Sequence, residues 1–342
     1  MKMGEQMHIP ENYLSPQTCG VMTAAMVPVW IHSVKKVKNE IPKSRMPLLG
    51  VGAAFSFLGM MFNVPLPGGT TGHAVGGTLI ACLLGPEAAC ISVTIALLIQ
   101  ALLFGDGGIL AFGANCFNMA FVLPFLGYFI YRLISKKLDS DKGRLLGAAI
   151  GSYVGINAAA LCAAIEFGIQ PMLFTNAAGQ ALYCPYGLGI SIPAMMIGHL
   201  TVFGAVELIF TTAILAFVLK VSPGMVKDHV GEKKTNSRPV YILMAAMICA
   251  VPLGLLATGT AWGEWGTDEI AEVVTNGASL GYTPAGMTGG FELSTIFPDY
   301  SIGGIPEAVG YILSAVIGVA IAIIVFRLIA GGMKTRTDFS HS

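Results

Sequence analysis

Long apolar stretches with almost no charged side chains recur along this chain from one end to the other. A helix that crosses a bilayer needs about 20 predominantly apolar residues. Stretches of roughly this kind lie at 16–32, 47–63, 74–85, 87–104, 116–134, 145–166, 190–219, 239–257 and 308–329. Because 54% of the residues are hydrophobic and only 11% are charged, the chain cannot cover a water-facing surface. We therefore predict an all-α integral membrane protein with about nine transmembrane helices.

The basic residues are confined to alternate connections between these stretches. Lys and Arg cluster at 35–45, 132–144, 220–238 and 327–336, and Lys2 alone lies elsewhere. Loops rich in Lys and Arg stay on the cytoplasmic side of a membrane. This pattern predicts that the N-terminus is outside and the C-terminus inside.

A polar and basic segment, 221–238, divides the chain into two units. It contains Pro223 and Gly224, which disfavour a continuing helix, and we interpret it as a cytoplasmic linker. The unit before it, 7–220, is predicted to contain seven spans. The unit after it, 239–342, is predicted to contain two spans and an external loop. That loop is acidic (Glu264, Asp268, Glu269, Glu272), which is typical of a solvated loop, although it could also gather cations.

Two histidines are predicted to lie on the external side. His8 precedes the first span, and His73 ends a glycine-rich loop between the second and third spans. Neutral imidazole is the commonest metal ligand in proteins. Spacing alone leaves open that the two are unrelated polar residues.

The position of His8 matters if the chain begins at Met7. A histidine in second place can close two fused chelate rings through the terminal amine, its own amide nitrogen and its imidazole. The imidazole of His73 would complete four nitrogens, a set that suits nickel(II) and copper(II), with cobalt(II) as a neighbour. The printed chain has six further residues before Met7, and a peptide bond there would remove the amine ligand. We therefore expect the functional protein to start at Met7.

Three segments together resemble one known family. They are 7–16 (Met-His-Ile-Pro-Glu-Asn-Tyr-Leu-Ser-Pro), 65–73 (Pro-Leu-Pro-Gly-Gly-Thr-Thr-Gly-His), and 104–119 with its Phe-Gly-Asp-Gly-Gly and Gly-Ala-Asn-Cys-Phe-Asn-Met runs. Over about 7–220 the chain resembles CbiM and NikM, the substrate-binding (S) membrane components of energy-coupling-factor cobalt and nickel transporters. Residues 239–342 resemble the two-span N-type component known for a Pro-Asp-Gly-Leu-Glu signature. The nearest match to that signature here is Pro-Leu-Gly-Leu-Leu at 252–256.

The resemblance implies a function and a set of partners. The chain would bind cobalt(II) or nickel(II) as transported substrate through Met7, His8 and His73, without an organic cofactor. It would act in a prokaryotic plasma membrane with a transmembrane T component and two ATPase subunits. A separate N component would be needed if residues 239–342 do not fulfil that role. Cobalt so imported could supply cobalamin biosynthesis. The chain itself would not be an enzyme.

Several other residues have two interpretations. Asn115 and Asn118 could orient His73 or cap a helix, and Asp106 is typical of a turn. His199 and Glu207, both inside an apolar stretch, are expected to pair between helices. His32 and His229, on the predicted cytoplasmic side, are expected to be dispensable.

Absent motifs exclude some functions. The sequence has no P-loop, no His-Glu-x-x-His and no Gly-x-Ser-x-Gly, and its net charge of zero suggests no nucleic-acid partner. An ATP-independent metal channel and a membrane metalloenzyme remain as alternatives. The metalloenzyme is disfavoured because four protein nitrogens would leave no open position at the metal.

Overall fold

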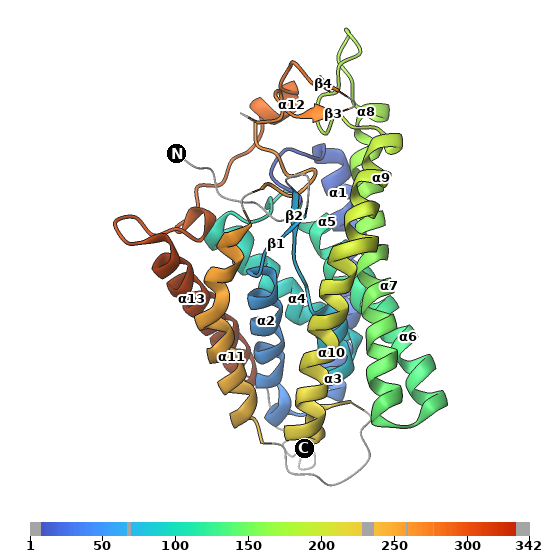
Figure 1. The fold of residues 1–342 in the computed structure, drawn as a ribbon, viewed down its shortest axis with the longest axis vertical. Coiled ribbons are helices and arrows are strands. Elements are labelled where there is room, and N and C mark those ends of the chain that lie inside the picture. The colour runs from blue at the N-terminus through green and yellow to red at the C-terminus, as the bar shows by residue number, and fades with distance from the viewer. Residues whose placement is uncertain are drawn as a thin grey trace, which may run out of the picture.

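The computed structural model describes residues 8–66, 70–227, 236–257, 259–267, 269–275 and 277–332, and it is mostly helical (Figure 1). Met7 with the residues before it, His229 and Asp268 lie outside the described residues. Below, the N-terminal part means residues 8–227 and the C-terminal part means residues 236–332.

The first helices of the N-terminal part begin at prolines. α1 (Pro16–Glu40) starts after Ser15, whose Oγ accepts a hydrogen bond from the Thr18 amide at 3.1 Å. Proline suits the first helical position because the amide that it lacks would have no partner there. α2 (Pro47–Met60) and α4 (Pro86–Ile99) also start with proline, and α3 (Gly77–Leu84) lies between them.

The remaining helices of this part form three long rods, and two of these contain a π-helical segment. The first rod is α5 (Phe112–Cys116), η3 (Phe117–Val122) and α6 (Leu123–Leu138), and the second is α7 (Asp141–Gly168) with α8 (Gln170–Leu173). The third is α9 (Leu188–Gly198), η4 (His199–Phe203) and α10 (Gly204–Val221). Before them, η2 (Gln100–Phe104) is a π-helical extension of α4. Both η3 and η4 are π-helical. Such segments are rare and occur frequently at functional sites.

The C-terminal part consists of two helices joined by a long loop. α11 (Arg238–Ala250) continues into the 3₁₀ segment η6 (Val251–Leu256), and α13 (Glu307–Gly332) closes the described chain. The loop between them carries β3 (Val274–Thr275), β4 (Ala278–Ser279), α12 (Ala285–Thr288) and η7 (Pro298–Tyr300). The other short elements of the chain are η1 (Lys43–Arg45), β1 (Val64–Leu66), β2 (Thr70–Gly72) and η5 (Pro223–Met225). β1 pairs antiparallel with β2, and β3 with β4.

Each predicted apolar stretch contains a helix, but within the described residues only six helical rods are long and apolar enough to cross a membrane. They are 86–104, 112–138, 141–173, 188–221, 238–256 and 307–332. α2 and α3, with 14 and 8 residues, have lengths of about 21 Å and 12 Å at 1.5 Å per residue, less than a bilayer core. The polar end of α1, which includes Lys35 and Lys36, lowers its mean hydropathy.

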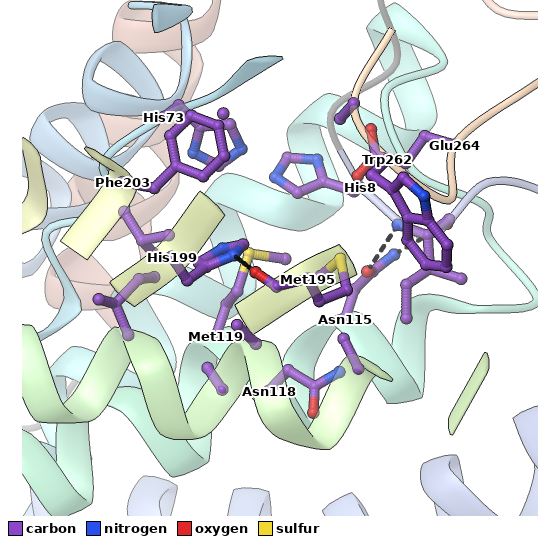
Figure 2. A pocket seen from close by; sticks show the side chains of 18 of the residues that line it. His8, His73, Asn115, Asn118, Met119, Met195, His199, Phe203, Trp262 and Glu264 are labelled. Atoms are coloured by element: carbon purple, nitrogen blue, oxygen red, sulfur yellow. Dashed lines mark hydrogen bonds between the residues drawn. The ribbon is translucent and has the colours of Figure 1, made fainter. Parts of the chain in front are cut away.

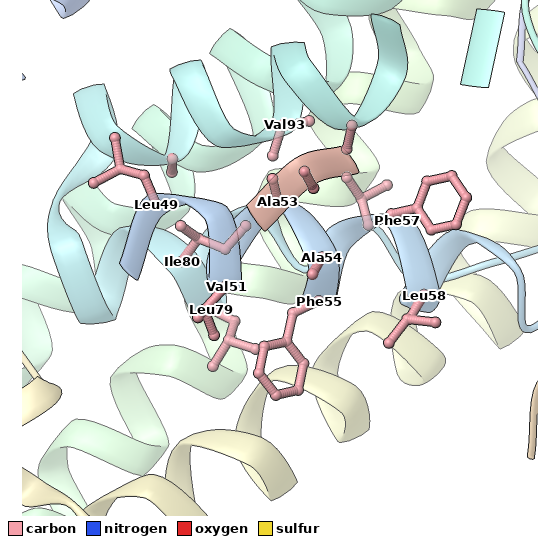
Figure 3. Close-up of a cluster of buried hydrophobic side chains, with 14 of the residues drawn as sticks. Leu49, Val51, Ala53, Ala54, Phe55, Phe57, Leu58, Leu79, Ile80 and Val93 are labelled. Carbon is pink, nitrogen blue, oxygen red and sulfur yellow. The ribbon is translucent and has the colours of Figure 1, made fainter. Parts of the chain in front are cut away.

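The core is centred on α2, which is buried on all sides (Figure 3). Its residues from Leu49 to Met60 are all buried, and α4 and α13 pack against it. Gly318 of α13 lies directly over the ring of Phe57. The Tyr311 hydroxyl donates to the Met61 carbonyl at 2.9 Å. The C-terminal part is therefore packed into the same core as the N-terminal part.

Candidate metal site

The segment that carries His8 is held against α5 and the loop before it. The side-chain amide of Asn115 accepts from the Ile9 amide at 3.1 Å and donates to the Ile9 carbonyl at 3.2 Å. The Glu11 carboxylate accepts from the Ile109 amide at 2.6 Å. Asn115 thus binds the backbone next to His8 in the way a neighbouring strand would. This contact differs from both roles predicted for Asn115, orienting His73 and capping a helix.

His73 follows β2, and a buried carboxylate anchors the backbone after it. Glu207 of α10 accepts from the amides of Val75 at 2.7 Å and Gly76 at 3.0 Å. The Nδ1 of His73 lies 3.3 Å from the Ala74 carbonyl, which can only accept a hydrogen bond. Nδ1 therefore carries the proton in that contact, and Nε2 keeps the lone pair that a metal needs. The expected pairing of Glu207 between helices is wrong, because its partners are the amides of Val75 and Gly76 and the hydroxyl of Thr211 in its own helix.

The imidazoles of His8 and His73 meet in one cavity (Figure 2). Their ring centroids are 5.2 Å apart at an interplanar angle of 70°, and the residues are only 2% and 9% exposed. The Nε2 of His8 is enclosed and has no hydrogen-bond partner among the described residues. Two potential ligands that are distant in sequence are therefore adjacent in the structure.

Asp106 occupies the turn that its sequence context predicts, and it also touches His8. Its Oδ1 lies 3.0 Å from the His8 Nδ1. Its Oδ2 accepts from the Tyr300 hydroxyl at 2.6 Å and from the Gln100 Nε2 at 3.3 Å. Burial, and then the charge of Asp106, raise the pKa of the Tyr300 phenol well above its usual value, so the hydroxyl remains a donor. A residue of the C-terminal part thereby reaches the candidate site.

The long loop of the C-terminal part also lines the cavity. The Trp262 amide donates to the Thr70 hydroxyl at 2.9 Å, and Glu264 points toward His8 (Figure 2). The Glu264 Oε2 is enclosed without a hydrogen-bond partner in the described part of the chain. Burial, and then the charge of Asp106, raise the pKa of this carboxyl well above its usual value. The expectation of a solvated acidic loop is wrong at Glu264.

Asn118 and His199 also line this cavity, whereas His32 lies elsewhere. The Asn118 Nδ2 donates to Glu166 of α7 at 2.9 Å. His199 lies beside Phe203 in the same cavity, and its Nδ1 is 2.9 Å from the Met195 carbonyl. The His32 side chain is 63% exposed at the opposite end of the molecule, 3.9 Å from Glu87. Within the described residues, no three His, Cys, Asp or Glu side chains form a ready metal cluster. The two imidazoles would therefore need other donors, such as backbone nitrogens.

Comparison with known proteins identifies the family. The description "Cobalt uptake substrate-specific transmembrane region" (CbiM) matches residues 8–225, and the PDGLE domain matches residues 237–335. The chain belongs to the CbiM family. The predicted resemblance is confirmed, including that of the tail, even though its five-residue signature is altered.

Relatives with the same two-part organisation cover nearly the whole chain. The probable fused nickel transport protein LarMN of Lactiplantibacillus plantarum is 51% identical over 98% of this chain and 100% of its own length. The fused nickel transport protein NikMN of Rhodobacter capsulatus is 45% identical over 95% of this chain and 97% of its own. A crystal structure of a truncated transition metal transporter is 60% identical, with a TM-score of 0.59, over 63% of this chain and 99% of its own.

These comparisons place the chain among the nickel and cobalt transport proteins. It is a multi-pass membrane protein of a prokaryotic transport family. The family comprises transport proteins and not enzymes.

Proposed function

We propose that this chain is the substrate-binding subunit of an ATP-driven importer of nickel or cobalt ions, and that the Met7 amine, His8 and His73 bind the ion. The main support is the meeting of the two buried imidazoles, with ring centroids 5.2 Å apart, in a cavity that also contains Glu264. The Asp106 carboxylate makes this region favourable for a cation, and Glu264 adds a carboxyl group that can release its proton when an ion binds. Most other cavity-lining side chains are apolar, which strengthens such electrostatic attraction.

The chelate that we propose uses Nδ1 of His8. A ring that starts at the His8 amide nitrogen passes through Cα, Cβ and Cγ, and it can close only at Nδ1. Without metal, this nitrogen lies beside the Asp106 Oδ1. Metal loading therefore replaces the Asp106 contact at Nδ1, while the Asp106 charge stays close to the ion. His73 contributes Nε2, because its Nδ1 faces the Ala74 carbonyl.

The four-nitrogen set favours nickel(II), which forms planar complexes with nitrogen ligands. Two relatives that match nearly the full chain are named as nickel transport proteins. We therefore propose nickel(II) as the preferred substrate and cobalt(II) as the competitor. In this proposal the substrate needs no organic cofactor, and cobalt entering by the same route could supply cobalamin biosynthesis.

The proposed topology has nine membrane-embedded segments, with the N-terminus outside and the C-terminus inside. This topology is supported by the position of the basic residues, which lie at the end of the molecule opposite His8. Lys36 lies 2.7 Å from Glu87, and Arg45 donates to the Gly224 carbonyl at 3.0 Å. Figure 1 shows the ends of α6 and α10 at this pole, opposite β3 and β4.

We propose that the chain itself has three parts. Residues 7–220 form the metal-binding domain and 221–238 form the linker. Residues 239–342 form an accessory unit that makes a separate N component unnecessary. Because the sequence has no P-loop, two ATPase subunits and a transmembrane T component must supply the energy.

Single and double alanine variants of His8 and His73 test this function. Each single variant should lose most high-affinity nickel uptake at limiting metal, and the double variant should lose little more, because ligands that act as a unit are not additive. The measurement is radiolabelled nickel and cobalt uptake by cells that also express the coupling subunits, normalised to the amount in the membrane. His32→Ala is the control, since its side chain is 63% exposed at the other end.

Near-normal uptake by His73→Ala would refute the proposed site. Uptake that persists without any coupling ATPase would instead indicate an ATP-independent channel. Mass spectrometry of the functional protein tests the Met7 ligand: a metal-loaded protein that keeps the first six residues would exclude the amine.

A further inference from the structure

A second cavity, of about 400 Å³, lies at the end of the molecule opposite His8, where α6 ends (Figure 1). It is lined by residues of α1, α4 and α6 and by Lys227, which follows η5. Its charged lining consists of four cations and one carboxylate: Lys36, Arg132, Lys136, Lys227 and Glu87. The carboxylate is already paired with Lys36 at 2.7 Å. The cavity therefore carries an excess of positive charge that the proposed metal transport does not use.

The fold sets the position of the Lys227 side chain. The Lys227 amide donates to the Cys82 carbonyl at 3.1 Å, and Arg45 donates to the Gly224 carbonyl at 3.0 Å, which fixes the turn before it. The ammonium lies over Gly85, where an added Cβ would come within 2.5 Å of the Lys227 Nζ. Gly85 also has a φ of 98°, a conformation that favours glycine. The glycine thus leaves room for a cation at the start of α4.

A tyrosine ring holds two of the cations at the same cavity. The Arg132 guanidinium carbon and the Lys227 Nζ each lie 5.9 Å from the centroid of the Tyr128 ring. Cations within about 6 Å of an aromatic ring are attracted to its face. Among the described residues, neither cation has a carboxylate partner, and Lys136 has none either. Like charges that share one cavity repel each other, so an anion bound between them would be stabilising.

The α6 wall of the cavity changes from apolar to cationic along its length. Phe125, Phe129, Leu133 and Lys136 follow one another at spacings of four, four and three, which places them on one face of the helix. Phe129 and Leu133 are 60% and 58% exposed. At 1.5 Å per residue this face is about 16 Å long. Its apolar part lies toward the middle of the proposed span, and its cations lie at the pole.

We propose that this cavity binds an anionic phospholipid, with the headgroup phosphate beside Arg132 and Lys227 and the acyl chains along Phe129 and Leu133. Basic pockets between transmembrane helices on the cytoplasmic side bind anionic headgroups, because that leaflet carries the anionic lipids. The inference goes beyond metal binding, and it uses the proposed topology, which places this pole at the cytoplasmic leaflet. A bound headgroup would also join α6 to the start of the linker at Lys227.

Native mass spectrometry of the purified full chain, given equal amounts of phosphatidylglycerol and phosphatidylcholine, tests the site. The wild type should retain one phosphatidylglycerol in preference to phosphatidylcholine. Arg132→Ala and Lys227→Ala should each weaken this binding about fivefold, the effect of one basic side chain near an anionic lipid. Arg132→Lys keeps the charge and should retain most of the binding. Lys137→Ala is the matched control, because Lys137 is an exposed cation of the same turn that does not line the cavity.

Three results would overturn the lipid site. They are a wild type without preference for phosphatidylglycerol, equal binding by Arg132→Ala and Lys137→Ala, and displacement of the lipid by an excess of inorganic phosphate. The last result would assign the cavity to free phosphate. Thermal unfolding in lipid-free detergent checks that each variant is folded. If Lys227→Ala is unfolded, the exposed Arg132 decides the question through its Ala and Lys variants.

Nickel titration of the same variants keeps this inference separate from the proposed function. The nickel affinity should be unchanged in all of them, because the second cavity and His8 lie at opposite ends of the molecule. Loss of lipid preference with normal nickel binding would support the lipid site. Loss of nickel binding in the Arg132→Ala variant would contradict the separation of the two sites.

Discussion

The two parts of the molecule contribute different things to the candidate site. The N-terminal part supplies both imidazoles and the backbone that carries them, anchored by Asn115 and Glu207. The C-terminal part supplies no imidazole within the described residues, but it brings Tyr300 to Asp106 and Glu264 into the cavity. The two candidate ligands and part of their support thus come from separate ends of the chain. We therefore propose that the C-terminal part adjusts a site whose imidazoles it does not provide.

The supports also differ in strength. Glu207 is fully buried, and its carboxylate holds the Val75 and Gly76 amides. Tyr300 donates a single hydrogen bond to Asp106, which keeps Gln100 as a second donor. If this contrast between the two parts is right, damage to the support in the N-terminal part should cost more than damage to the support in the C-terminal part.

The largest effect is expected for Glu207→Ala. The change leaves two buried amides without an acceptor, at about 1–3 kcal/mol each, and it releases the backbone that follows His73. We expect tight nickel binding to be lost and thermal stability to fall. Glu207→Gln keeps one acceptor oxygen and should lose less. The measurements are nickel titration and thermal unfolding of the purified protein.

Glu87→Ala is the matched control for this change. Glu87 is also a carboxylate in an apolar rod, but it pairs with Lys36 at the opposite pole. It should leave the nickel affinity unchanged. If Glu207→Ala binds nickel as well as Glu87→Ala does, the anchoring role of Glu207 is wrong.

A smaller effect is expected where the two parts pack together. A side chain at Gly318 would collide with the Phe57 ring, which is fully buried and contacts Phe104 and Tyr300 with centroids 5.6 Å and 6.2 Å away. Overpacking of a core costs about 1–3 kcal/mol. Gly318→Ala should therefore lower the thermal midpoint. It should weaken nickel binding no more than loss of the hydrogen bond from Tyr300 to Asp106 does. Gly331→Ala, with open space around it, should be neutral in both assays.

Much of the fold could be predicted from apolar stretches and charge alone. Each predicted stretch contains a helix, yet α2 and α3 are shorter than a span, because β1 and β2 pair as strands near the site where a helix would otherwise continue. Gly147, Gly151 and Gly155, spaced four residues apart, lie where α7 comes closest to the backbone of α6. Small residues at a spacing of four report helix packing reliably, because they leave only backbone at the contact.

The support of the site could not be predicted in the same way. His8 and His73 lie in motifs that resemble a family, whereas Tyr300 has no local signal. Asp299 and Tyr300 are non-glycine residues with φ of 55° and 57°, a conformation that sequence patterns do not indicate. Glu207 is noticeable as a charge in an apolar stretch, but its partners are amides of a loop more than a hundred residues away. Long-range contacts of this kind require the folded chain.

The finest test of the contrast between the two parts is Tyr300→Phe. It removes only the hydroxyl that donates to the Asp106 Oδ2, and keeps the ring that stacks on Phe104 with centroids 4.7 Å apart. Asp106 should then be held less firmly beside His8, and its charge should be less well placed for the ion. Direct outer partners of a metal ligand typically contribute about 10–100-fold in affinity. We expect a loss below about 10-fold here, because Tyr300 acts only through the position of the Asp106 charge and Gln100 still donates to the same oxygen.

Tyr311→Phe is the matched control, because it too removes a buried tyrosine hydroxyl from the C-terminal part, and its partner is the Met61 carbonyl. It should lower thermal stability without changing nickel affinity. The double variant Tyr300→Phe with Asp106→Asn should bind no more weakly than Asp106→Asn alone, since Tyr300 acts through Asp106. Equal nickel affinities for Tyr300→Phe and Tyr311→Phe would mean that the C-terminal part contributes packing alone. Additive losses in the double variant would mean that Tyr300 acts on the ion by a route that bypasses Asp106.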